Sequence, residues 1–175
     1  EGSSFTIARG IIMAVDKGAS IINMSIGSPD PSPILEDAVN YAIEKGVIMV
    51  AAVGNEGEDN VSFPAAYDGV IGVGAIDEFE NYQMFSNRGD EVDVMAPGLS
   101  VPTLNIEGKS VLMTGTSFAS PLVAAALADM LSHDHGTSSD DMVQSLFDNA
   151  NEAGMPGIDK LYGNGVLNVE RLKYD

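Results

Sequence analysis

The fold of this chain is decided at residues 33–53, which read PILEDAVNYAIEKGVIMVAAV. The first half of this stretch repeats apolar residues at helical spacing, and Pro33 and Gly46 are typical of the start and end of a helix. Residues 47–53 are apolar almost throughout, as expected for a strand that is covered on both faces. A helix followed directly by a fully buried strand predicts an α/β fold with a parallel sheet.

The same alternation extends to both sides of this stretch. Residues 7–15 repeat apolar side chains at helical spacing before Gly18, and residues 21–26 then read as a short strand. Residues 70–76 form another apolar run of strand length. Helices that alternate with buried strands imply parallel pairing through right-handed crossovers, so we expect these strands to form one parallel sheet.

The second half of the chain carries more β-strand patterns. Residues 92–95 read as a short strand that ends before Pro97 and Gly98. Residues 101–104 and 110–113 lie on either side of a glycine-containing turn and predict a hairpin. The first half is thus expected to form the layered sheet, with a β-rich portion added to it.

Two further helices are expected near the C-terminal end. Residues 118–131 are rich in alanine and leucine, which predicts a buried helix. Ser138 and Asp141 form a capping pair in front of a helix at residues 142–150. No repeat, low-complexity tract or linker interrupts the sequence, so the chain is one domain or part of one.

Composition excludes several classes of function. Acidic residues outnumber basic ones by 26 to 8, which gives a formal net charge of −18. Such a chain has no basic patch for nucleic acid or for an anionic membrane surface. The charge is compatible with bound cations, basic substrates, a salty extracellular setting, or solubility alone. The longest apolar runs are far shorter than the ~20 residues of a membrane span, and without cysteine there is no disulfide or thiol chemistry.

The segment GTSFASP, residues 115–121, places a serine between a glycine-containing turn and the start of an apolar helix. That position exposes the hydroxyl group, and the helix N-terminus offers N–H groups and a positive dipole end to an anion. Ser117 is therefore a candidate nucleophile. Taken alone, the segment is better explained by a serine that caps the helix.

A second candidate follows the buried strand directly, in the segment AAVGNEG at residues 51–57. Open α/β sheets place their sites at the C-terminal ends of parallel strands, and the Asn55 amide can donate to a developing oxyanion. A turn-forming Asn-Glu-Gly loop is the better explanation of this segment by itself.

Together the two segments resemble the subtilisin family (the subtilases), and the likeness runs through nearly the whole chain. Other stretches similar to that family are IINMSIGS (21–28), FPA (63–65), VIGVGA (70–75), FSNRG (85–89), VDVMAPG (92–98) and YGNGVLN (162–168). The resemblance implies the C-terminal portion of a subtilisin-type three-layer parallel sheet. Residues 1–175 would then be a partial catalytic domain.

The resemblance also implies a role for each matching residue. Ser117 would be the acylating nucleophile of a serine endopeptidase, and Asn55 with the Ser117 backbone N–H would form the oxyanion hole. One edge would pair with extended substrate backbone, namely Ser25, Ile26 and Gly27. The facing wall of the primary specificity pocket would be Ala52, Val53 and Gly54. Glu56 would lie near the pocket floor, where a carboxylate favours lysine or arginine.

The main departure from the family is an absence. The family order is aspartate, histidine, then serine, and here both histidines, His133 and His135, follow Ser117. The sequence His135-Gly136-Thr137 is similar to the family's catalytic-histidine motif, but it lies at the far end of the helix that Ser117 begins. We therefore expect the catalytic aspartate and histidine on an N-terminal fragment, and no activity from this chain alone. The alternative is a non-catalytic subtilase-like module that grips extended peptides.

The remaining signals are weak. The acidic pairs at 58–59 and 140–141 lack the ordered spacing of a calcium loop, and Gly72-Val73-Gly74 lacks the rest of a dinucleotide fingerprint. Acyl transfer requires no cofactor. The resemblance leaves room for a structural calcium or other cation, held by backbone carbonyls near Ala65, Tyr67 and Val70. It also implies peptide or protein substrates and a secreted or cell-surface location.

Overall fold

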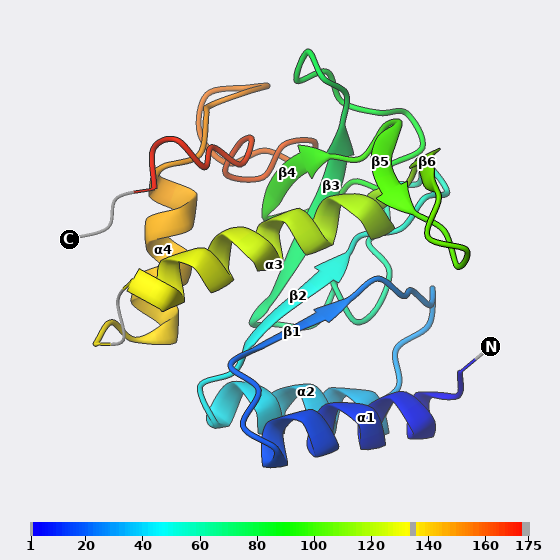
Figure 1. Cartoon of the computed structure of the whole chain (residues 1–175), viewed down its shortest axis with the longest axis vertical. Coiled ribbons are helices and arrows are strands. Elements are labelled where there is room, and N and C mark those ends of the chain that lie inside the picture. The colour runs from blue at the N-terminus through cyan, green and yellow to red at the C-terminus, as the bar shows by residue number, and fades with distance from the viewer. Residues whose placement is uncertain (1, 134–135, 173–175) are drawn as a thin grey trace.

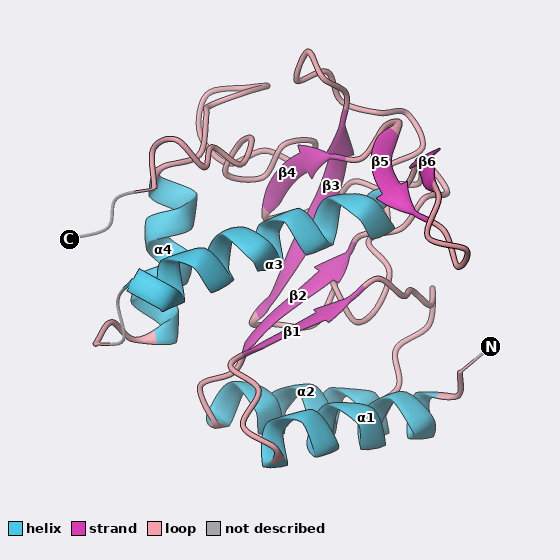
Figure 2. Ribbon diagram, viewed as in Figure 1, coloured by secondary structure: helices cyan, strands magenta, loops and turns pink. Residues whose placement is uncertain are grey.

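A computed structural model describes residues 2–133 and 136–172. Its centre is a four-stranded sheet in which every neighbouring pair is parallel and the order is β1-β2-β3-β4 (Figures 1 and 2). The strands are β1 (Ile21–Met24), β2 (Ile48–Ala52), β3 (Val70–Ile76) and β4 (Val94–Pro97). The expected parallel sheet is confirmed.

Helices cover both faces of this sheet, which makes the arrangement three-layered (Figure 1). On one face lie α1 (Ser4–Asp16) and α2 (Pro33–Glu44), which pack against each other. On the other face α3 (Thr116–His133) packs against all four strands, and α4 (Ser139–Asp148) packs against α3. Within the described residues, no helix is both long and apolar enough to cross a bilayer.

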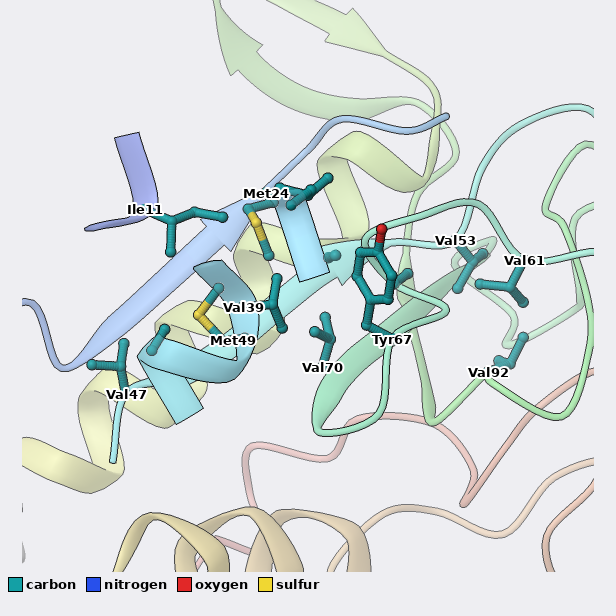
Figure 3. Close-up of a cluster of buried hydrophobic side chains, with 14 of the residues drawn as sticks. Ile11, Met24, Val39, Val47, Met49, Val53, Val61, Tyr67, Val70 and Val92 are labelled. Carbon is teal, nitrogen blue, oxygen red and sulfur yellow. The ribbon is translucent and has the colours of Figure 1, made fainter. Parts of the chain in front are cut away.

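The two faces of β2 show why this strand is apolar throughout. Met49 and Ala51 point into a core cluster with α1 and α2, shown in Figure 3, whereas Ile48 and Val50 point into a second cluster with α3 and α4. Successive side chains of a strand face opposite sides, so a central strand between two helix layers needs apolar residues at every position. The chain met this requirement at residues 47–53, as the sequence predicted.

The predicted hairpin is confirmed as β5 (Val101–Leu104) and β6 (Ser110–Met113), an antiparallel pair outside the main sheet. The predicted cap is confirmed as well. The Asp141 backbone N–H donates to Ser138 Oγ, and the Ser138 hydroxyl donates to the Asp141 carboxylate at 2.7 Å. Both features are local in sequence, which is why pattern alone predicts them.

Some element boundaries differ from the sequence prediction. The first strand ends at Met24, and residues 25–27 leave the sheet to form one side of a cavity. The helix expected at 118–131 begins earlier, at Thr116, and contains Pro121. The candidate nucleophile is therefore inside the first turn of α3, because the chain turns into the helix directly after Gly115.

Candidate active site

A cavity of about 370 Å³ opens where the C-terminal ends of β1 and β2 meet the N-terminus of α3. The residues predicted for the site that line it are Ser25, Ile26, Gly27, Ala52, Gly54, Asn55, Glu56 and Ser117. Further lining residues, for which the sequence predicted no role, include Pro29, Glu58, Ser62, Asn87 and Thr116. Segments far apart in the sequence thus meet at one pocket, at the sheet edge where α/β folds place their sites.

The structure removes Val53 from the predicted pocket wall. Its side chain is 0% exposed and belongs to the same core cluster as Met49, where Figure 3 shows it beside Val61. It is not among the residues that line the cavity. Alternation along the chain explains the difference, because the neighbours Ala52 and Gly54 face the pocket while Val53 faces the core.

Ser117 presents an unpaired donor as well as a hydroxyl group. Within the described residues, its backbone N–H makes no hydrogen bond, whereas the N–H of Phe118 donates to Gly115 O and that of Thr116 donates to Asn55 Oδ1. The first N–H groups of a helix have no intrahelical acceptor and carry its positive dipole end. Ser117 therefore offers a free N–H beside its own Oγ.

The orientation of the Asn55 amide is fixed by its neighbours. Asn55 Oδ1 accepts from the Thr116 backbone N–H at 2.8 Å and from the Thr116 hydroxyl at 3.1 Å. A backbone N–H can only donate, so the amide must turn its oxygen toward Thr116. Its NH₂ group makes no hydrogen bond to any described residue. Asn55 thus brings a second free donor to the pocket that holds the free Ser117 N–H.

A proline in α3 anchors one wall of the pocket. Pro121 has no N–H to donate to the carbonyl four residues earlier, which belongs to Ser117. Ser25 Oγ donates to that carbonyl at 2.8 Å instead. The wall at residues 25–27 is thereby tied to the turn of helix that carries the candidate nucleophile.

Two more polar side chains complete this attachment. The hydroxyl of Ser120, which is 0% exposed, donates to Asn23 Oδ1 at 2.8 Å, and Asn23 Nδ2 donates to Ser25 Oγ at 3.1 Å. We call Asn23, Ser25 and Ser120 the nucleophile-side network. All of its groups are neutral, and it links the end of β1 to the start of α3.

The opposite side of the pocket is held by a different set of groups. One oxygen of Glu56, Oε2, accepts from the Asn55 backbone N–H and from Asn87 Nδ2, both at 2.9 Å. Asn87 Oδ1 in turn accepts from the backbone N–H groups of Glu56 at 3.0 Å and Glu58 at 3.1 Å. We call Asn55, Glu56 and Asn87 the oxyanion-side network.

Gly54 is required by this network. Its φ is +111°, and a Cβ atom there would lie 2.3 Å from Asn87 Nδ2 and 2.8 Å from Glu56 Oε2. A side chain at this position would therefore push both hydrogen-bonding partners apart. Glycine is needed before Asn55 because the Asn87 side chain, which comes from a distant segment, occupies the space that a Cβ atom would fill.

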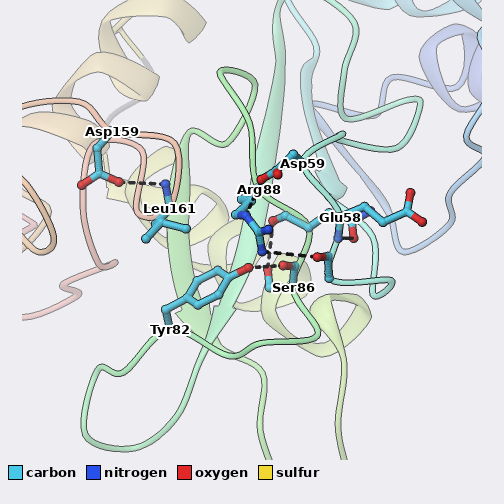
Figure 4. A network of polar contacts seen from close by, with 9 residues as sticks. Glu58, Asp59, Tyr82, Ser86, Arg88, Asp159 and Leu161 are labelled. Carbon is cyan, nitrogen blue, oxygen red and sulfur yellow. Dashed lines mark hydrogen bonds and ion pairs between the residues drawn. The ribbon is translucent and has the colours of Figure 1, made fainter.

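The charges around the pocket are negative and mostly unpaired. Glu56 and Glu58 line it, and none of the described residues that line it is basic. Arg88 lies beside the same loop, but it forms an ion pair with Asp59 and donates to Gly57 O at 3.3 Å (Figure 4). Its positive charge is already matched by Asp59.

A partly buried carboxylate, Asp93, lies elsewhere on the sheet, where β4 begins beside β3. Burial raises the pKa of Asp93 to about 6, and the hydrogen bond from the Gly72 backbone N–H, at 2.7 Å, opposes this shift. The nearby negative charge of Glu91 raises the pKa further. Asp93 is not among the residues that line the cavity, so its charge affects stability rather than the pocket.

The described histidine is too far from Ser117 to act as its base. His133 ends the helix that begins at Thr116, so 16 residues of helix at 1.5 Å rise separate it from Ser117 by about 24 Å. His135, whose motif is similar to that of the family's catalytic histidine, lies outside the described residues. Within the described residues, no group of three or more His, Cys, Asp or Glu side chains could hold a metal ion.

The sequence profile of the subtilase family (Peptidase_S8) matches residues 1–165. The chain belongs to the subtilase family. It is 38% identical over 169 residues to Subtilisin Savinase from Lederbergia lenta, covering 97% of this subtilase chain and 62% of that protein. It is equally identical over 169 residues to an alkaline protease from Alkalihalobacillus alcalophilus, of which it covers 44%. The subtilase chain therefore spans between two fifths and two thirds of these curated relatives.

Solved structures agree with this assignment. A lanthipeptide protease superposes with a TM-score of 0.90 at 26% identity, over 98% of this chain and 66% of that one. The patellamide maturation protease PatA superposes with a TM-score of 0.87 at 33% identity, over 97% and 67%. The subtilisin-type α/β fold expected from the sequence is confirmed.

Sequence reasoning missed Thr116, Ser120 and Asn87 as parts of the site. Thr116 and Ser120 lie inside the motif that contains Ser117, and a polar residue on the buried side of an apolar helix was the available signal. Asn87 lies in FSNRG, a segment without any pattern that connects it to the loop at Asn55. Only the fold brings it there.

Proposed function

We propose that this subtilase is a serine endopeptidase that hydrolyses peptide bonds by acyl transfer to Ser117. The observation that supports it best is the pair of unpaired donors, the Ser117 N–H and the Asn55 NH₂, in the pocket that also contains the Ser117 hydroxyl. Two free donors beside a nucleophile form a site for an oxyanion. A surface that only grips peptides has no need of either.

In the proposed reaction, Ser117 Oγ attacks the carbonyl carbon of the scissile peptide bond, and its proton passes to a base. The carbonyl oxygen becomes an oxyanion that accepts from Asn55 Nδ2 and the Ser117 N–H. The C–N bond then breaks as the amine takes up the proton, and water later hydrolyses the acyl ester. Residues 25–27 are proposed to pair with the backbone of an extended substrate, opposite Ala52 and Gly54.

The base and its orienting acid are proposed to come from a segment outside these 175 residues. Neither described wall of the pocket contains a histidine, and β1 has no strand partner on its outer side within the described residues. An N-terminal segment of the same protease, carrying the aspartate and the histidine, is the proposed partner along that edge. A secreted or cell-surface location and a cation near Ala65 remain predictions.

Labelling with a serine-directed fluorophosphonate tests this function. We expect stoichiometric labelling at Ser117 in the protein that contains the acid and base, and none in its Ser117→Ala variant. The isolated chain of 175 residues should label far more slowly, because Ser117 then remains a neutral hydroxyl. Labelling of the isolated chain at an enzymatic rate would contradict the need for a second segment. No labelling in either preparation would favour the non-catalytic peptide-binding module.

A further inference from the structure

The two carboxylates of the pocket are in different states. Glu56 Oε2 is occupied by the Asn55 N–H and by Asn87 Nδ2, so its movement toward a ligand would release the loop that carries Asn55. The Glu58 carboxylate makes no hydrogen bond or ion pair with any described residue. One of the two is therefore a structural acceptor, and the other is free.

The backbone of Glu58 is nevertheless firmly held. Its N–H donates to Asn87 Oδ1 at 3.1 Å, and its carbonyl accepts from the Arg88 N–H at 3.0 Å. Figure 4 shows this attachment between Glu58 and Arg88. A charged side chain on a fixed backbone, at the edge of a cavity of about 370 Å³, has a defined reach into that cavity.

No positive charge in the described part of the chain compensates Glu58. The nearby guanidinium of Arg88 is paired with Asp59. The cavity also has apolar lining, from Ile26, Pro29 and Ala52. A pocket with an apolar side and an uncompensated carboxylate fits a long side chain with a methylene stem and a cationic head.

We infer that Glu58 is the specificity-determining residue of this pocket, and that it selects substrates with lysine or arginine at the primary specificity position. Glu56 is then a positioning residue for Asn55 and contributes less to this choice. The inference rests on the proposed function, in which the residue whose peptide bond is cut enters the cavity beside Ser117. It changes the sequence prediction, which placed the selecting carboxylate at Glu56.

The test measures binding separately from cleavage, so that the two proposals fail independently. The Ser117→Ala form of the protein, together with the segment that supplies acid and base, is titrated with fluorescent extended peptides that differ only by lysine or methionine at one position. We expect the lysine peptide to bind more tightly. Glu58→Gln should lower the lysine-to-methionine affinity ratio about fivefold, as expected for an exposed ion pair worth about 1 kcal/mol.

Two variants serve as comparisons. Glu44→Gln removes the same charge from an exposed position on α2 and should leave the ratio unchanged. Glu56→Gln keeps an oxygen that accepts from Asn55 and Asn87, so it should change the ratio less than Glu58→Gln does. A salt titration of the unmodified pocket needs no further variant, and the lysine preference should weaken as salt screens the exposed charges.

Each outcome decides one of the two proposals. A lysine preference that depends on Glu58, with no cleavage by the Ser117 form, would support this inference and overturn the hydrolytic function. Cleavage with no lysine preference, or a preference that survives Glu58→Gln, would overturn the role of Glu58. A preference removed by Glu56→Gln and kept by Glu58→Gln would return the role to Glu56. Absence of peptide binding in the cavity would overturn the inference as well.

Discussion

The nucleophile-side and oxyanion-side networks hold the two walls of one pocket by different means. The nucleophile-side network consists of neutral groups, and it exists because Pro121 leaves the Ser117 carbonyl open to Ser25. The oxyanion-side network contains a carboxylate and a buried amide, and Asn87 is only 2% exposed. The comparison indicates that the first wall is held through a helix hydrogen bond that Pro121 cannot make. The second wall is held by the Asn87 side chain, which comes from a distant loop.

The difference has a consequence for charge. A neutral network keeps its hydrogen bonds at any moderate pH, whereas a carboxylate in a network adds charge to the site. That charge lies on the side of the pocket where Glu58 is also found. The oxyanion side of the pocket thus carries both Asn55, the proposed hydrogen-bond donor to the oxyanion, and Glu58, the proposed determinant of specificity.

The largest expected effect concerns Asn55, the member of the oxyanion-side network that carries the proposed donor. In the active protein, Asn55→Leu should lower kcat by the two to three orders of magnitude that are typical when a subtilisin loses its oxyanion-hole asparagine, with a smaller change in KM. Leucine removes the NH₂ group that no described residue engages, together with the Oδ1 that accepts from Thr116. Steady-state kinetics on a peptide substrate measures both constants, and an unchanged kcat would remove Asn55 from the oxyanion hole.

The oxyanion-side network is tested next by Asn87→Ala. This change removes the acceptor of the Glu56 and Glu58 N–H groups and the donor to the Glu56 carboxylate. Unsatisfied buried groups cost about 1–3 kcal/mol each, so we expect a loss of about 3 kcal/mol in unfolding free energy and a fall in kcat. Chemical denaturation and kinetics check the two effects. If a variant that is equally destabilised at a remote site loses as much kcat as Asn87→Ala does, the role of Asn87 is only structural.

Asp93 offers a comparison for a carboxylate that has only one described donor, the Gly72 N–H. Its pKa of about 6 in the folded state lies above the value of about 3.9 for an unfolded aspartate. Proton binding by Asp93 in the folded state therefore contributes fully to the free energy of unfolding below about pH 4. This contribution is lost as pH rises through 6.

Asp93→Asn should consequently raise the unfolding free energy by about 2 kcal/mol at pH 8, and by little at pH 4. The asparagine oxygen can still accept from Gly72, so the variant removes charge without removing the acceptor. Unfolding curves at both pH values measure the difference, with Asp37→Asn as an exposed control. An equal effect at the two pH values would contradict the raised pKa.

The smallest expected effect concerns the nucleophile-side network. Ser25→Ala removes the donor to the Ser117 carbonyl and should cost about 1 kcal/mol. In a Pro121→Ala background the same change should cost less, because the alanine N–H can donate to that carbonyl. A double-mutant cycle of the two substitutions measures the coupling by denaturation. Strict additivity would show that the proline is not the reason for the Ser25 contact.

Most elements of this subtilase, and the positions of its two motifs, can be predicted from local patterns along the chain. Apolar spacing and apolar runs predicted α1, α2, β2 and β3, because burial on one or both faces imposes a repeat that is visible locally. The hairpin was predicted from its turn glycine, α3 from its alanine and leucine content, and α4 from the capping pair in front of it. The motifs around Asn55 and Ser117 were recognised by their combined resemblance to the subtilisin family, since each alone is better explained by a turn or a helix cap. Each lies at the junction of a glycine turn with a strand or a helix.

How these residues are held, and which of them are free, depends on contacts between distant parts of the chain. Asn87 reaches Glu56 from a segment 31 positions away, and Ser120 reaches Asn23 across 97 positions. Val53 belongs to the core, and Glu58 lines the pocket, because a side chain's surroundings depend on elements that its own neighbours in sequence do not contain. Hydrogen bonds and charges are paired in space, so a linear pattern cannot show which donor or carboxylate remains without a partner.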